Sequence, residues 1–91
     1  MIQRHVWVSG EVQGVGFRMA TFREAQKFPS VRGYVKNLSD GRVEAVFTGQ
    51  DADVLTLAAW CKKGPAAANV TRIEVKEEPC NLSLSGFEIL D

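Results

Sequence analysis

The fold of this chain is decided by the stretch Val6-Trp7-Val8-Ser9-Gly10-Glu11-Val12-Gln13-Gly14-Val15-Gly16-Phe17-Arg18. It begins with an apolar, β-branched run, continues through three glycines within seven residues, and leads into a segment of helix-forming composition. Glycine lets the backbone adopt conformations that are closed to other residues. The stretch therefore predicts a strand, a tight loop and a helix that follow one another directly.

The loop itself has the features of an anion site. A glycine loop that leads into a helix directs unpaired N–H groups, and the positive end of the helix dipole, at one point. Arg18 adds a planar charged group suited to two oxygens of a phosphate or carboxylate. No third glycine in register and no Gly-Lys-Ser/Thr follows, so the loop matches neither a dinucleotide fingerprint nor a P-loop. It predicts a cradle for one phosphoryl group, with a purely structural turn as the alternative.

Strands are predicted wherever apolar and polar residues alternate. The alternating segments cover residues 3–9, 31–38, 42–48, 70–76 and 82–90. In the first segment, Val6 and Val8 share one face, and His5, expected to be solvated, lies on the other. Asp40-Gly41 separates the second and third segments and predicts a hairpin turn. The last segment is expected to pair at a sheet edge.

Two helices are predicted from apolar residues that recur every three or four positions. The apolar side of the first is formed by Met19, Phe22, Ala25 and Phe28. Pro29 ends this helix, because the residue before a proline avoids helical angles. Asp51 is the expected N-cap of the second helix. The apolar stripe of that helix is formed by Val54, Leu57, Ala58 and Cys61.

The order of these elements defines the expected architecture. It reads strand, helix, strand, strand, helix, strand, followed by a short final strand. Two strand–helix–strand crossovers around a hairpin describe a ferredoxin-like α+β fold. Right-handed crossovers place both helices on one face of the sheet. We therefore predict a single domain over residues 1–91, an antiparallel sheet with two helices on one face.

Composition narrows the class of protein. Hydrophobic residues make up 45% of the chain, yet no apolar run is long enough to span a bilayer. No secretory signal is visible at residues 1–5, so we expect a cytoplasmic protein with no membrane partner. Lysine and arginine number 11, as do aspartate and glutamate, which argues against a nucleic-acid binder. No Cys/His cluster has metal-ligand spacing, and the two cysteines are expected to be free thiols, with one bridge left open.

A second polar feature lies in the stretch Lys36-Asn37-Leu38-Ser39-Asp40-Gly41, at the end of the second predicted strand. The amide of Asn37 offers both a donor and an acceptor. One interpretation is structural, because asparagine often ties down a turn. The other is functional: in the expected fold this strand end can lie near the glycine loop, where an amide could hold a water beside a bound anion.

Together these stretches resemble the acylphosphatases. The resemblance lies in residues 10–18 and 33–44, continues in residues 64–70 and 87–89, and covers almost the whole chain. It implies a small enzyme that hydrolyses the carboxyl–phosphate bond of acyl phosphates, releasing a carboxylate and inorganic phosphate without metal or cofactor. A monomer is expected. The chain departs from the family at Phe28-Pro29-Ser30-Val31, where a Leu-Gly-Leu type turn is frequent, and at Tyr34, where tryptophan is common.

The resemblance also implies roles for individual residues. Arg18 would bind the phosphate and Asn37 would orient the attacking water. The cradle would be completed by the backbone amides of Gln13, Gly14, Val15, Gly16 and Phe17. Neither departure from the family pattern touches the two catalytic positions, Arg18 and Asn37.

Two other functions compete with this hypothesis. One is a non-enzymatic module that senses an anion or binds carbamoyl phosphate, because related domains occur within larger proteins. The other is an RNA-binding domain of the same element order, with Trp7 and Tyr34 as stacking residues. The balanced charge and the absence of the aromatic-glycine RNA motif argue against the second.

Overall fold

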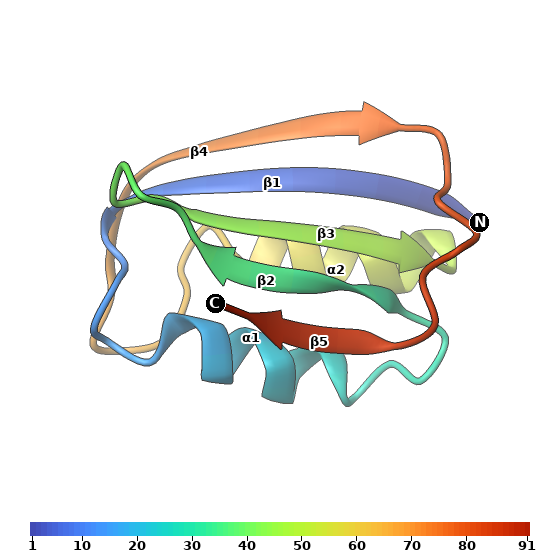
Figure 1. Cartoon of the computed structure of the whole chain (residues 1–91), viewed down its shortest axis with the longest axis horizontal. Helices are drawn as coiled ribbons and strands as arrows, with labels where there is room; N and C mark the ends of the chain where they lie inside the picture. Colours follow the sequence, from blue (N-terminus) through green and yellow to red (C-terminus); the bar gives the residue numbers. More distant parts are fainter.

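The computed structural model describes residues 1–91 as one five-stranded sheet with two helices (Figure 1). The elements are β1 (Ile2–Glu11), α1 (Phe17–Ala25), β2 (Arg32–Asn37), β3 (Val43–Gly49), α2 (Asp51–Trp60), β4 (Asn69–Glu78) and β5 (Phe87–Leu90). The strand order across the sheet is β4-β1-β3-β2-β5. Helix α2 packs on β1 and β3, and α1 packs on β2 and β5. The ferredoxin-like α+β prediction is confirmed.

One part of the predicted topology needs correction. Four strands pair antiparallel, but β5 pairs parallel with β2, with Gly33 opposite Phe87 and Lys36 opposite Leu90, so the sheet is mixed. The reason lies in strand directions. Strands β4 and β2 run in opposite directions, so a chain that leaves β4 and crosses the end of the sheet must enter β5 in the direction of β2 (Figure 1).

The core fills the space between the sheet and the helices. Val6 and Val8 of β1 are fully buried, as the alternation predicts. Across the sheet they are joined by Val35, Val43, Ala45 and Phe47. The predicted stripe of α2 is confirmed, because Val54, Leu57, Ala58 and Cys61 all lie in this core.

The predicted apolar side of α1 is only partly correct. The helix ends at Ala25, before Pro29, and its buried face is formed by Phe17, Thr21 and Ala25. Met19 is 48% exposed. The buried face is rotated because Phe17 anchors the first turn in the core, and Thr21 is tolerated there since its hydroxyl donates to the Phe17 carbonyl at 2.8 Å.

The structure also tests the expected N-cap of α2, the state of the cysteines and the absence of a membrane span. Gln50, not Asp51, precedes α2, and the Asp51 carboxylate pairs with the Met1 amine at 3.1 Å. Cys61 and Cys80 are both free thiols, which settles the question of a bridge. No helix combines the length and apolarity that crossing a bilayer requires.

Candidate active site

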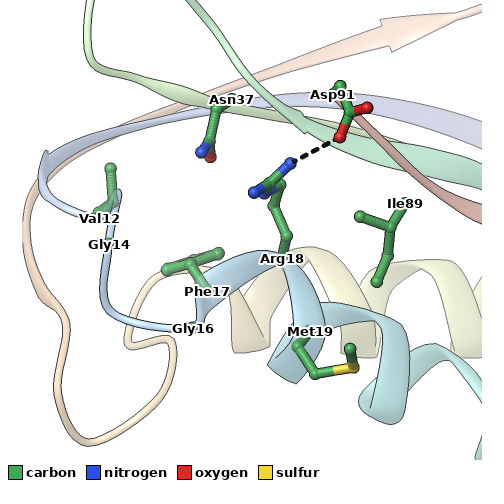
Figure 2. A pocket seen from close by; sticks show the side chains of 9 residues that line it. All are labelled: Val12, Gly14, Gly16, Phe17, Arg18, Met19, Asn37, Ile89 and Asp91. Atoms are coloured by element: carbon green, nitrogen blue, oxygen red, sulfur yellow. Dashed lines mark ion pairs between the residues drawn. The ribbon is translucent and has the colours of Figure 1, made fainter.

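The glycine loop, the start of α1 and the ends of β2 and β5 enclose a cavity of about 270 Å³ (Figure 2). Its lining consists of Val12, Gly14, Gly16, Phe17, Arg18, Met19, Asn37, Ile89 and Asp91. Arg18 and Asn37, which are 19 positions apart in the sequence, therefore face one space. The fold brings together the two halves of the site that the sequence suggests.

The loop owes its shape to glycines in left-handed conformations. Gly14 has a φ of 75° and Gly16 a φ of 77°, and no residue other than glycine has a positive φ. A Cβ at either position would meet nothing within 4 Å, so the backbone conformation, not space, calls for glycine there. Gly16 precedes α1, and no side chain caps the helix start. The first N–H groups of α1 are therefore available to an anion.

Phe17 fixes the helix start against the core. Its side chain is 1% exposed and its ring packs on Trp60, with centroids 5.7 Å apart. Gly64, in the segment between α2 and β4, lies so close that a Cβ there would come within 2.4 Å of the Phe17 ring. The chain after α2 thus holds down the residue that precedes Arg18.

Arg18 is held at one end of its guanidinium only. Nη1 donates a hydrogen bond to the Leu90 carbonyl at 3.0 Å and lies 3.7 Å from the Asp91 carboxylate. Nε and Nη2 make no hydrogen bond within the chain. Figure 2 shows the guanidinium rising from the start of α1 between Asn37 and Asp91. The end of β5 thereby orients Arg18 and leaves part of its donor set free.

Asn37 is the last residue of β2 and is half-buried. Its side chain makes no hydrogen bond within the chain, and Figure 2 shows the amide directed into the cavity. The hairpin is closed by other groups: Gly41 N–H donates to the Leu38 carbonyl at 3.2 Å, and the Asp40 carboxylate accepts from Arg42. The structural interpretation of Asn37, as a tie for the turn, is therefore wrong.

The turn itself is the three-residue type. Only Gly41 has a positive φ, of 97°, and the Leu38 N–H donates to the Arg42 carbonyl at 2.8 Å across the mouth of the hairpin. A loop of Ser39, Asp40 and Gly41 with glycine at the left-handed position is a common hairpin form. It places Asn37 at the rim of the cavity, immediately before the hairpin closes.

The residues that line the cavity differ in part from those named from the sequence. Gln13 and Val15 lie in the loop without lining the cavity, and the Gln13 side chain instead reaches the hairpin. Ile89 and Asp91 line the cavity because β5 runs parallel to β2, which no local pattern indicates. Met19, predicted to be core, lines the cavity beside Arg18.

The titratable groups of the site are few. Arg18 and Asp91 are the only ones that line the cavity. His5, the one histidine, lies on the open face of the sheet, where its ring nitrogens contact Glu44 at 3.0 Å and Glu78 at 2.9 Å. The expectation of a solvated His5 is therefore wrong, and His5 is not among the residues that line the cavity.

Comparison with known proteins gives a consistent result. Residues 4–89 match the family model described as Acylphosphatase. The acylphosphatase of Gloeobacter violaceus is 52% identical over 89 residues, which cover 98% of this chain and 94% of that protein. The crystal structure of acylphosphatase from Bacillus subtilis superposes with a TM-score of 0.91 at 36% identity, over 100% of both chains.

A larger protein contains a similar unit. The structure of T. kodakarensis HypF matches 100% of this chain but only 12% of its own length, with a TM-score of 0.83 and 37% identity. Because the family match and the G. violaceus likeness both run along nearly the entire chain, this protein belongs to the acylphosphatase family and is an enzyme that hydrolyses acyl phosphates.

Proposed function

We propose that the cavity between the glycine loop and Asn37 is the active site for this hydrolysis. The observation that supports it is the juxtaposition in one cavity of free donors on Arg18 and an unpartnered amide on Asn37. A bound phosphate and an attacking water need these two kinds of group on opposite sides. Residues 1–91 act as one domain in this proposal, because one sheet holds all five strands and one hydrophobic core joins it to both helices.

The cradle binds the phosphoryl group. Arg18 offers Nε and Nη2 to two phosphate oxygens, and the backbone amides of Gln13, Gly14, Val15, Gly16 and Phe17 surround the remaining oxygens. Phosphoryl transfer needs mainly positioning and stabilisation of charge on the equatorial oxygens. A preorganised nest of amides with a fixed guanidinium supplies both without a metal ion.

Asn37 positions the water that attacks phosphorus. An amide is a poor base, so Asn37 orients the water by hydrogen bonding, and a phosphate oxygen accepts the proton. The P–O bond to the acyl group breaks as the new P–O bond forms, and the carboxylate leaves without needing protonation. The products are a carboxylate and inorganic phosphate.

The decisive experiment measures phosphate release from a simple acyl phosphate in the presence of EDTA. We expect turnover by the wild-type chain and almost none by Arg18→Ala. Loss of wild-type turnover on chelation would show that a metal ion takes part. Binding of the acyl phosphate without turnover would instead favour the anion-sensing module, a role consistent with a similar unit forming 12% of the HypF chain.

The RNA-binding alternative has less support. Trp7 is stacked on His5, with ring centroids 3.8 Å apart, so one face of the Trp7 ring is already occupied on the open side of the sheet.

We propose that the partners are acyl phosphate and inorganic phosphate, with no nucleic acid and no membrane. We further infer a cytoplasmic monomer, because both cysteines are free and the site is complete within one chain. Size-exclusion chromatography with light scattering tests the monomer.

A further inference from the structure

The side chain of Gln13 bridges the glycine loop to the β2–β3 hairpin. Its Nε2 group donates to the Leu38 carbonyl at 2.7 Å and to the Arg42 carbonyl at 2.9 Å. Both partners are acceptors, so the group facing them is the NH2 of the amide and both of its hydrogens are used. One side chain thus joins segments that are 25 and 29 positions apart in the sequence.

The two acceptor carbonyls, of Leu38 and Arg42, lie where the hairpin loop begins and ends, next to Asn37. Leu38 directly follows Asn37, and the Arg42 carbonyl also accepts the Leu38 N–H that closes the hairpin at 2.8 Å. Gln13 therefore binds the two residues that flank the hairpin loop, and one of them, Leu38, directly follows Asn37, whose amide faces the cavity. No other hydrogen bond joins residues 12–16 to residues 37–42.

The sheet joins the two halves of the site only indirectly, because β1, which leads into the loop, and β2, which ends at Asn37, both pair with β3. Asn37 makes no side-chain hydrogen bond, and the loop contains two glycines, Gly14 and Gly16, without a side-chain cap at the helix start. A shift of about 1 Å between reacting groups can cost about 100-fold in rate. Gln13 makes the direct contact between the loop and the hairpin, so it is placed to fix the last part of this separation.

We infer that Gln13 is a positioning residue, whose side-chain amide sets the separation between the phosphate cradle and Asn37. This rests on the proposed function, because it assigns Asn37 a water-orienting role. The side chain of Gln13 points to the hairpin, and Gln13 is not among the residues that line the cavity. Its side chain acts on catalysis through Asn37, while its backbone amide belongs to the cradle.

The test uses Gln13→Met, which keeps length and volume but removes both donors. We expect kcat for a simple acyl phosphate to fall about 10- to 100-fold. The inhibition constant of inorganic phosphate should change less than about threefold, because the cradle and Arg18 are intact. Thermal stability should change little, because Gln13 is exposed and water can replace its hydrogen bonds. Gln26→Ala, an exposed glutamine at the far end of α1, is the matched control and should behave as wild type.

A double-mutant cycle separates positioning from other roles. If Gln13 acts through Asn37, Gln13→Met should lower kcat in the wild-type background but have almost no further effect on Asn37→Ala. Multiplicative losses in the double variant would overturn the inference, because the Gln13 side chain would then act independently of Asn37. A wild-type kcat for Gln13→Met would overturn it as well. Inactivity of the wild-type chain would refute the proposed function instead, so the two failures are distinguishable.

A second variant and a measurement on the wild-type protein keep the inference testable even if Gln13→Met fails to fold. Gln13→Asn keeps the amide but is one methylene shorter, and it should show the same kcat defect. In the wild-type protein, NMR should show Gln13 side-chain NH2 protons shifted downfield and slowed in exchange. Random-coil shifts and rapid exchange for that group would contradict the bridge without any substitution.

Discussion

In the proposed mechanism, Arg18 and Asn37 divide the chemistry between phosphate binding and the attack step. Arg18 brings free donors of a permanent charge to the cavity, and Asn37 brings one uncharged amide. Their removal should therefore change different kinetic constants. At the residue scale, the proposed roles can therefore be distinguished by whether a substitution changes KM, kcat or the inhibition constant of phosphate.

Replacing Arg18 with alanine should raise KM and the inhibition constant of phosphate and remove most turnover. Replacing Asn37 with alanine should lower kcat about 10²- to 10³-fold, the scale for one positioned polar group, with little change in phosphate binding. Steady-state kinetics with phosphate as inhibitor measures both variants. An Asn37→Ala variant that kept full kcat would exclude the water-positioning role.

Gly14 tests the need for a left-handed backbone in the cradle. Alanine there meets no neighbour, so the only cost of Gly14→Ala is its φ of 75°, about 1–2 kcal/mol. Relieving that strain would turn a cradle amide away, and phosphate affinity should fall. Gly86→Ala is the control, because it also meets open space but has no positive φ. Equal phosphate affinity in the two variants would argue against the cradle geometry.

Strand β2 depends on one glycine for its pairing with β3. Gly33 has a φ of 151°, and a Cβ there would lie 1.7 Å from the Val46 carbonyl oxygen. Backbone cannot move away as a flexible side chain can, so the strands themselves must separate. Asn37 ends β2, which makes this pairing part of the support of the site.

We expect Gly33→Ala to lower the free energy of unfolding by about 3 kcal/mol or more. Urea denaturation followed by circular dichroism measures this. Gly86→Ala again serves as the control, this time on the segment that precedes β5. A Gly33→Ala variant as stable as wild type would mean that β2 can shift relative to β3 without cost.

At the scale of the whole sheet, two carboxylates, Glu44 and Glu78, flank His5 on the open face. Hydrogen bonds from His5 and from Gln3 hold the pKa of Glu78 below its ordinary value of 4.5, despite the opposing effect of burial. The folded state thus binds fewer protons than the unfolded state in this range. The stability that Glu78 contributes is present above about pH 4.5 and is lost as pH falls through its lowered pKa.

Glu78→Gln should therefore lower the melting temperature most near neutral pH, where the native carboxylate is charged. Below pH 6 the melting temperature of this variant should fall less steeply with acid than that of the wild type. Differential scanning calorimetry across this range measures the effect. Glu77→Gln, whose carboxyl is 82% exposed, is the matched control on the same strand. Parallel acid profiles for wild type and Glu78→Gln would refute the linkage.

The single core also protects a thiol. Burial raises the pKa of Cys61 to about 12, so the reactive thiolate is scarcely present in the folded protein. In a Cys80→Ser background, Cys61 should react with a disulfide reagent only as fast as the protein unfolds, and fast in denaturant. Rapid labelling under native conditions would show that the core opens locally around α2.

The sequence by itself determined those features that depend on near neighbours. Alternation placed Val6 and Val8 on the inner face, and helical spacing placed Val54 and Leu57 in the core. Asp40-Gly41 identified the hairpin. The glycines also gave the loop its left-handed turns, and with Arg18 they predict an anion cradle, since backbone conformation and charge are local properties. Periodicity was only partly right for α1: Ala25 is buried as predicted, but Phe17, adjacent to the loop, took the core position expected of Met19.

Only the tertiary structure decided which distant groups meet. The parallel entry of β5 brings Ile89 and Asp91 to the cavity, and the end of the hairpin offers two carbonyls to Gln13. Neither contact has a sequence pattern, because each depends on the register and direction of strands far apart in the chain. The physical reason is that periodicity along the chain determines which face of an element a side chain occupies. Which residue lies opposite that side chain depends on how the strands pair and pack in the folded sheet.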